Sequence, residues 1–155
     1  MSKQTMVVAP DDRATSLNVV GEQITVLASG EQTGSYEIFL QAGPEGTGPP
    51  PHSHDWDEAF YVLRGEVAFT AGDVDRTAGP GTLVVVPRGT THSFRLGAGG
   101  TEMLSFTSSA GAAAFFTDID RQIAPDRPDL DTLVAVATAH GLAVAGPPAE
   151  VDAPA

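Results

Sequence analysis

The chain contains no cysteine among its 155 residues, which excludes disulfides, thiolate metal ligands and cysteine nucleophiles together. It also has no apolar run approaching the roughly 18 residues that a membrane-spanning helix needs. The first residues carry too few apolar side chains for a secretory signal, so we expect a cytoplasmic protein. Phosphate-loop and serine-nucleophile motifs are missing as well, so the sequence indicates neither of these chemistries.

Basic residues are scarce. There are 8 Lys and Arg against 20 Asp and Glu, for a formal net charge of −12. A surface of this sign repels the phosphates of nucleic acids and anionic lipids. We therefore expect neither a nucleic-acid nor a membrane partner.

What the sequence does contain is a regular series of short apolar runs separated by glycine, proline and aspartate. Turn signals that recur every eight to twelve residues are typical of an all-β sandwich or barrel. We expect strands at residues 19–28, 35–42, 59–63, 66–71, 74–77, 82–86, 92–96 and 101–107.

After these strands the composition shifts to alanine-rich segments that favour helices at residues 109–121 and 131–139. Ser108 or Ser109 is a candidate cap of the first helix, and Asp129 or Asp131 of the second. The predicted organisation is an N-terminal arm at 1–17, a barrel at 18–108, and C-terminal helices and a tail at 109–155.

Three of the four histidines lie in two glycine-punctuated stretches. His52, His54 and Glu58 share a parity, so in an extended strand all three would face one cavity. His92 comes from a later strand, after a Pro-x-Gly turn that would aim its ring into the same barrel. Three imidazoles and one carboxylate suit a divalent transition metal with open coordination positions. His140, near a predicted helix end, is better explained as a surface or capping residue.

The two stretches resemble the two sequence motifs of the cupin superfamily. The first motif is glycine, five residues, His-x-His, three or four residues, glutamate, six residues and glycine, which fits Gly46, His52, His54, Glu58 and Gly65. The second is glycine, five residues, Pro-x-Gly, two residues and histidine, which fits Gly81, Pro87, Gly89 and His92. Leu96 departs from the asparagine that is common after the second motif, at a position that is not a ligand.

The resemblance, closest to small single-domain bacterial members similar to quercetin 2,3-dioxygenases, implies a double-stranded β-helix, or jelly-roll barrel. It implies one divalent ion of iron, nickel, manganese, cobalt, copper or zinc, held by His52, His54, Glu58 and His92. In quercetinase-like cupins the motif glutamate is taken to remove a proton from the substrate hydroxyl. The resemblance therefore implies a catalytic role for Glu58 as base.

Apolar side chains on the predicted barrel strands would form the walls of a substrate pocket, which suits an aromatic or otherwise hydrophobic ligand. Some share the parity of the metal-ligand candidates, and others lie on neighbouring strands. The candidates are Phe39, Trp56, Phe60, Val62, Phe94, Met103 and Phe106.

These features favour a metal-dependent dioxygenase that acts on a flavonol-like or other enolisable small molecule, with O₂ as the second substrate. One alternative is a non-oxidative enzyme that uses the metal as a Lewis acid, such as a polyketide cyclase, a lyase or an isomerase. The other is a non-catalytic cupin that binds a small molecule. One ligand set serves many chemistries, so the sequence leaves all three open.

We also expect a homodimer, because the exposed edges of β-sandwiches need covering and small cupins commonly pair. The arm at 1–17 and the strand at 19–28 are the candidate interface elements.

Overall fold

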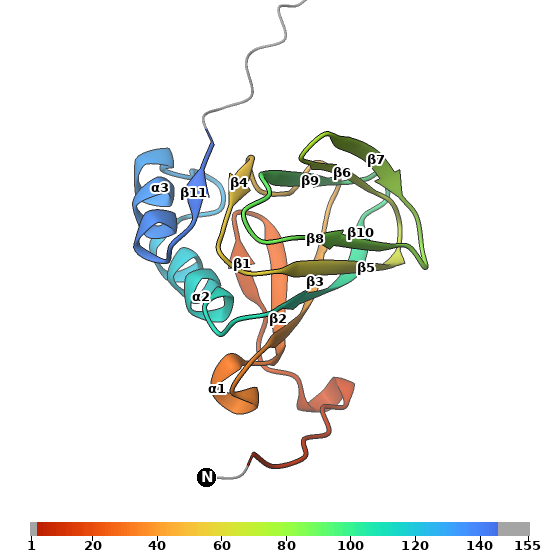
Figure 1. Cartoon of the computed structure of the whole chain (residues 1–155), viewed down its shortest axis with the longest axis vertical. Helices are drawn as coiled ribbons and strands as arrows, with labels where there is room; N and C mark the ends of the chain where they lie inside the picture. The colour runs from red at the N-terminus through yellow and green to blue at the C-terminus, as the bar shows by residue number, and fades with distance from the viewer. Residues whose placement is uncertain (1–2, 146–155) are drawn as a thin grey trace, which may run out of the picture.

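The computed structural model describes residues 3–145, and within that range the strands form two facing antiparallel sheets (Figure 1). The six-stranded sheet contains, in spatial order, β1 (Leu17–Val19), β2 (Glu22–Ala28), β3 (Glu37–Gly43), β10 (Thr101–Thr107), β5 (Glu58–Arg64) and β8 (Leu83–Val86). The five-stranded sheet contains β11 (Ala143–Val144), β4 (His52–Ser53), β9 (His92–Leu96), β6 (Val67–Ala71) and β7 (Val74–Ala78). The expected all-β barrel with short C-terminal helices is confirmed.

The core lies between the two sheets because alternate side chains of each strand point inward. In β10 the residues with odd numbers are buried and those with even numbers are half-exposed. The same alternation buries Phe60 and Val62 on β5 and Phe94 and Leu96 on β9. Inward residues of both sheets join in one apolar cluster that closes this part of the barrel.

Two longer helices, α2 (Ala112–Gln122) and α3 (Leu130–Ala139), lie together at one end of the barrel beside β1 and β11 (Figure 1). Phe115 and Ile119 of α2 and Ile123, which caps its C-terminal end, pack with Val136 of α3. Because β11 pairs with β4, the C-terminal segment also contributes a strand to the second sheet. The helices are therefore a wall of the barrel rather than a separate appendage.

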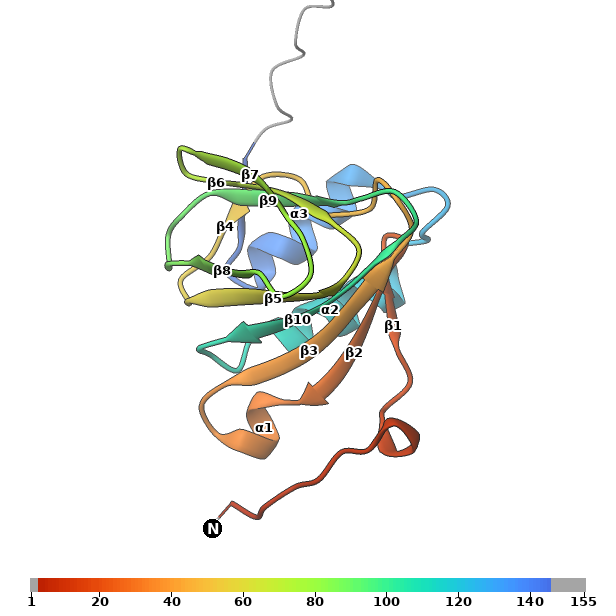
Figure 2. The ribbon, with the colours of Figure 1, turned by 90° about the vertical axis from the view of Figure 1, so that its right-hand side faces the viewer.

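The N-terminal arm carries a short 3-10 helix at Pro10–Asp12 and lies outside β1 and β2, with the one-turn helix α1 (Gly30–Thr33) near it (Figure 2). Ser29 caps α1 by accepting a hydrogen bond from the backbone N–H of Gln32. The sequence predicted only a turn at this place. In the described part of the chain, no helix combines the length and the apolar composition required to cross a membrane.

The stretch 19–28, predicted to be one strand, is instead a hairpin of β1 and β2. Val20 and Gly21 form its turn with φ of 51° and 91°, as a two-residue hairpin turn requires. The Asn18 side chain accepts a hydrogen bond from the Gly21 N–H, and the Asn18 N–H donates to Asp120 of α2. Contacts distant in sequence thus stabilise a turn in which the β-branched Val20 is intrinsically unfavourable.

Helix α2 begins three residues later than expected, with Gly111 rather than a serine as its N-cap. Ser108 accepts a hydrogen bond from the Asp57 N–H instead. The side chain of Glu37, on β3, accepts from the N–H of Ala113 and takes over the capping role. Helix α3 has Asp129 as its N-cap, one of the two residues predicted for it.

Candidate metal centre and pocket

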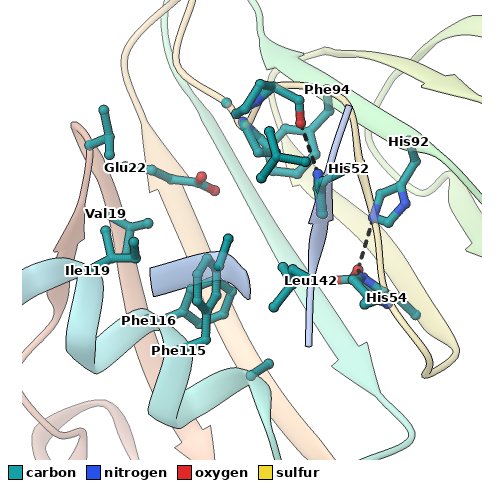
Figure 3. Close-up of a pocket in the computed structure, with 18 of the residues that line it drawn as sticks. Val19, Glu22, His52, His54, His92, Phe94, Phe115, Phe116, Ile119 and Leu142 are labelled. Atoms are coloured by element: carbon teal, nitrogen blue, oxygen red, sulfur yellow. Dashed lines mark hydrogen bonds and ion pairs between the residues drawn. The ribbon is translucent and has the colours of Figure 1, made fainter. Parts of the chain in front are cut away.

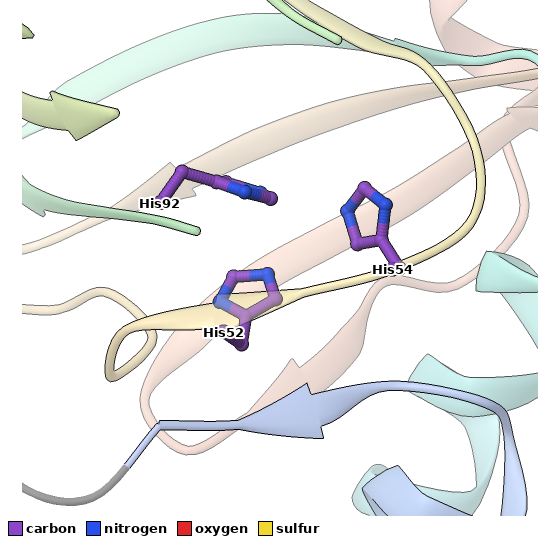
Figure 4. Close-up of side chains that lie close together, drawn as sticks. All are labelled: His52, His54 and His92. Carbon is purple, nitrogen blue, oxygen red and sulfur yellow. The ribbon is translucent and has the colours of Figure 1, made fainter. Parts of the chain in front are cut away.

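His52, His54 and His92 converge at one end of the barrel (Figure 4). His52 lies on β4 directly opposite His92, the first residue of β9, and His54 lies in the loop that follows β4. The ring centroids of His52 and His92 are 4.3 Å apart, and those of His54 and His92 are 4.9 Å apart. One ring nitrogen of each histidine lies within 4.8 Å of the others, so this group could hold a metal ion.

The sequence argument assumed that His52, His54 and Glu58 lie on one extended strand with alternating side chains, but the structure brings them together differently. Between β4 and β5 the chain leaves one sheet and enters the other, so His52 and Glu58 belong to different sheets. The His54 carbonyl accepts a hydrogen bond from the Gly89 N–H, which ties this crossing to the turn before His92. Asp57 and Arg88 form an exposed ion pair across the same two segments, with 3.0 Å between Oδ2 and Nη2.

The loop before His52 approaches β9 so closely that it requires a glycine. Gly48 has φ of +149°, and a Cβ there would lie 2.0 Å from the Phe94 carbonyl oxygen. Arg95 donates from Nη1 to the Pro49 carbonyl and adds a second tie between loop and strand. The Pro50 carbonyl then accepts a hydrogen bond from Nδ1 of His52, so the loop orients the first histidine directly.

All three histidines are oriented in the same way. Nδ1 of His52, His54 and His92 lies 2.9, 3.1 and 2.9 Å from the backbone carbonyls of Pro50, Trp56 and Thr90. A carbonyl only accepts, so each Nδ1 carries the hydrogen, and in the neutral ring Nε2 presents its lone pair. A backbone hydrogen bond on the other ring nitrogen is the usual way in which a protein orients a metal-binding imidazole.

Glu58 contacts two of these rings through one oxygen. Its Oε2 lies 2.8 Å from Nε2 of His54 and 3.2 Å from Nε2 of His92. A carboxylate oxygen facing two imidazole lone pairs is repulsive unless protons or a cation supply positive charge between them. The three histidines form a group that fits a divalent transition metal ion, and Glu58 adds a carboxylate oxygen beside two of their rings.

Without a metal, the same contacts set the ionisation of the group. Burial would raise the pKa of Glu58, but hydrogen bonds from His54 and His92, whose Nε2 then carries a proton in place of a metal, outweigh it and hold this pKa at about 2. Burial, together with the neighbouring His92, lowers the pKa of His52 to about 4. Burial would also lower the pKa of His92, but the hydrogen bond to Glu58 outweighs it and raises this pKa. Near neutral pH Glu58 is an anion and His52 is neutral, which are the forms that bind metals.

A mostly apolar pocket opens beside this centre (Figure 3). Barrel strands supply His52, His92, Glu58, Phe60 and Phe94, and the C-terminal segment supplies the facing wall. That wall consists of Ala112, Phe115, Phe116, Ile119, Leu133, Ala137, Leu142 and Val144.

Three of the predicted pocket residues, Trp56, Phe60 and Phe94, line it. The Trp56 ring stacks on His54 with 4.1 Å between centroids and 5° between planes. The other four predicted residues do not line it, since Phe39, Val62 and Met103 are fully buried in the core and Phe106 lies on the outward-facing parity of β10. Alternation selects an inward face but does not tell which part of that face borders the cavity.

Sequence reasoning missed two polar residues, Glu22 and Gln41, and the apolar wall from α2 and α3. The one available signal for Glu22 was its parity with Ile24, which placed a carboxylate on the inward side of an apolar strand. His140 lies at the C-cap of α3, where its Nε2 is 2.6 Å from Oδ2 of Asp118, away from the three-histidine group.

Comparison with known proteins agrees with this architecture. Residues 39–107 match the family model described as "Cupin domain". The chain is 33% identical over 102 residues to the quercetin 2,3-dioxygenase of Bacillus subtilis (strain 168). That match covers 64% of this chain and only 30% of the relative, so the chain spans less than a third of the relative's length.

Solved structures share the fold at low identity. KdgF from Halomonas sp. superposes with a TM-score of 0.62 at 19% identity, covering 68% of this chain and 94% of that one. The polyketide cyclase RemF from Streptomyces resistomycificus superposes with a TM-score of 0.58 at 21% identity, covering 67% of this chain and 79% of the cyclase. An RmlC-like cupin from Shewanella frigidimarina superposes with a TM-score of 0.61 at 16% identity, covering 70% of this chain and 96% of that one. The motifs, the two-sheet barrel and these matches agree that residues 39–107 form a cupin domain and that the chain has the cupin fold.

Proposed function

We propose that this protein is a metal-dependent dioxygenase that acts on a flavonol-like or other enolisable small molecule. The observation that carries the proposal is the convergence of three histidines and Glu58 beside an apolar pocket. The similarity to a quercetin 2,3-dioxygenase supports this reaction class over other uses of the same centre.

His52, His54, Glu58 and His92 are the residues that would hold the metal. Their side chains are buried or half-buried, and every Nδ1 is already engaged by a backbone carbonyl, so the histidines need no reorientation to present Nε2. A bound divalent transition metal would polarise a substrate oxygen as a Lewis acid and supply the one-electron chemistry that O₂ needs.

Glu58 would act as the base that removes the proton of the substrate hydroxyl. In the metal-free protein, hydrogen bonds from the protonated Nε2 atoms of His54 and His92 keep the pKa of this carboxyl low. With a metal on these nitrogens, the cation would take over that role and keep the carboxylate ionised, which is the form that accepts a proton. Both histidine contacts use Oε2, so neither involves the second oxygen of the carboxylate. The apolar residues around Glu58 exclude water and strengthen the attraction of the carboxylate for a proton donor.

The first test is elemental analysis of protein purified without chelators or a nickel column. We expect about one transition-metal ion per chain in the parent protein. His52→Ala and His92→Ala should each lose it, because each removes one donor of the set. His140→Ala is the matched control, since His140 lies outside the group, and this variant should keep the metal. Loss of metal in all three variants, or in none, would contradict the assignment.

The second test is O₂ uptake by the metal-loaded protein with quercetin as substrate. We expect uptake in the parent protein and a loss of at least about 100-fold in Glu58→Gln, the usual scale of a general base. Glu58→Gln should still bind some metal through the three histidines. Turnover without O₂ would instead favour a non-oxidative lyase, isomerase or cyclase, and binding without product would favour a non-catalytic cupin.

A further inference from the structure

Two buried polar side chains line the pocket and are not used by the metal centre. Glu22, the first residue of β2, is 4% exposed, and its Oε1 has no hydrogen-bond partner among the described residues. Gln41, on β3, is 3% exposed, and its Oε1 is likewise without a partner in the described part of the chain. Both residues border the pocket that contains the three histidines.

The sheet places these two side chains next to each other. The register pairs Ile24 with Gln41 and Gln23 with Ala42, so Glu22 lies diagonally across from Gln41 on the inner face. Diagonal neighbours of this kind are close enough for long side chains to contact one group together. Figure 3 shows the Glu22 carboxyl group pointing into the pocket from the side opposite His92.

Leaving such groups unpaired is unfavourable. A buried polar atom without a hydrogen bond has lost its hydration and gained no contact that offsets the loss. The surrounding wall, which includes Val19, Ile119 and Phe116, is apolar, and an apolar side chain at either position would pack against it without this loss. Two neighbouring residues that line one pocket and each have an unsatisfied oxygen therefore indicate a ligand group that completes them.

We propose that Glu22 and Gln41 form a second polar contact of the pocket, which binds a hydroxyl group of the ligand across the cavity from the metal centre. The protonated carboxyl of Glu22 would donate to the hydroxyl oxygen, and Oε1 of Gln41 would accept the hydroxyl hydrogen. A hydroxyl offers both functions at one atom, which a carbonyl or an ammonium group does not.

The ionisation of Glu22 is consistent with this donor role. Burial and the negative charge of Glu58 raise the pKa of Glu22 to about 8, so the carboxyl keeps its proton near neutral pH. The ligand class that follows is an aromatic molecule with one oxygen for the metal and a further hydroxyl on its far side. The choice of an aromatic enol rests on the proposed function, whereas the hydroxyl contact rests on Glu22 and Gln41.

The test compares the binding of quercetin and of 3-hydroxyflavone, which keeps the enolisable hydroxyl but lacks the others. Zinc-loaded protein is used, because zinc supports no redox chemistry and turnover cannot interfere. Quenching of Trp56, the single tryptophan, reports binding, since this ring stacks on His54 in the pocket wall. We expect the parent protein to bind quercetin at least about 10-fold more tightly than 3-hydroxyflavone.

In Glu22→Leu and Gln41→Leu, the ratio of the affinity for quercetin to that for 3-hydroxyflavone should fall toward one. The affinity for 3-hydroxyflavone itself should stay within about 3-fold of the parent value. Glu22→Gln, which keeps a donor and the side-chain shape, should retain part of the preference. Glu45→Gln, on the exposed loop before His52, is the matched control and should change neither affinity. Melting temperatures and zinc content establish that each variant is folded and loaded.

The proposal would be overturned if the parent protein bound quercetin no more tightly than 3-hydroxyflavone, because a water alone would then occupy the contact. It would also be overturned if both leucine variants kept the parent's preference for quercetin, or if the parent bound neither flavonol. If the preference for quercetin depends on Glu22 but the metal-loaded protein takes up no O₂, this contact is upheld and the dioxygenase is rejected. O₂ uptake with a preference that ignores Glu22 would do the reverse.

Discussion

Two carboxyl groups of the pocket, both buried, ionise in opposite ways. The pKa of Glu58 is about 2 because hydrogen bonds from His54 and His92 outweigh its burial. The pKa of Glu22 is about 8 because burial and the charge of Glu58 both raise it. Environments that push paired acids apart identify which group accepts a proton and which group donates one. By this reasoning Glu58 is the acceptor and Glu22 the donor.

The raised pKa of Glu22 predicts that stability falls as pH rises. Its folded pKa of about 8 exceeds the ordinary value of 4.5, so the folded protein binds more protons than the unfolded chain between these values. The stabilisation is complete below the unfolded pKa and is lost as pH rises through 8. We expect the free energy of unfolding of the parent protein, minus that of Glu22→Gln, to fall by up to about 1.4 kcal/mol per pH unit between pH 5 and 8.

Urea unfolding of both metal-free proteins at pH 5, 6, 7 and 8 measures this difference. The histidines titrate in both proteins, so most of their contribution cancels in the subtraction. A difference that stays flat, or rises with pH, would show that Glu22 ionises as an ordinary carboxyl.

Among the secondary-structure elements, α2, one of the two helices that wall the pocket, is held at its start by one buried carboxyl of β3. Glu37 is 1% exposed and accepts hydrogen bonds from the Gly30 N–H at 2.9 Å and the Ala113 N–H at 3.0 Å. Gly30 begins α1 and Ala113 lies in the first turn of α2, so one carboxyl satisfies free N–H groups at two helix starts. This contact orients α2, which carries Phe115, Phe116 and Ile119 into the pocket wall.

We expect Glu37→Gln to lower the free energy of unfolding by about 1–3 kcal/mol. The amide can still accept one bond, but its NH₂ group faces a backbone donor and the charge-assisted contact is lost. Urea unfolding measures the change. Glu31→Gln, on the exposed side of α1, is the matched control and should change stability by less than about 0.5 kcal/mol. Equal effects of the two substitutions would contradict a special role for Glu37.

Taken as a whole, the molecule has an apolar outer face on one side of the six-stranded sheet. Tyr61 and Leu63 of β5 and Leu83 and Val85 of β8 are exposed there, with Leu83 at 56% and Val85 at 62%. Strand β8 is the outer strand of that sheet, so these side chains lie beside a free edge. The sequence pointed to the arm at 1–17 and the strand at 19–28 as interface elements, which lie at the opposite edge of the same sheet.

We propose that the homodimer forms through this outer face, covered by a second copy of the chain, rather than through the opposite edge that the sequence suggested. Light scattering coupled to size-exclusion chromatography should then give a dimer mass for the parent protein and a monomer mass for Leu83→Glu. Val74→Glu is the matched control, because Val74 is also 56% exposed but lies on β7 of the other sheet. A monomeric parent protein, or the same change of mass in both variants, would contradict this interface.

The strands and the metal-ligand candidates could be predicted from local sequence. Apolar alternation and turn residues report directly on strands, because the period of a β-strand is short and its ends need glycine, proline or aspartate. The spacing of His52, His54, Glu58 and His92 was likewise readable, since two short motifs contain all four residues. The absence of cysteine excluded disulfides and thiolate chemistry, and the scarcity of basic residues predicted that polyanionic partners are disfavoured.

Only the tertiary structure decided what surrounds these residues. Glu22 and Gln41 meet because two strands pair in a particular register, and the wall from α2 and α3 exists because β11 joins the second sheet. The Val20–Gly21 turn and the cap of α2 depend on Asn18, Asp120 and Glu37, which are distant in sequence from at least one of their partners. Such contacts form between segments that carry no local signal of each other, so the sequence determined the metal-ligand candidates and the fold determined the pocket beside them.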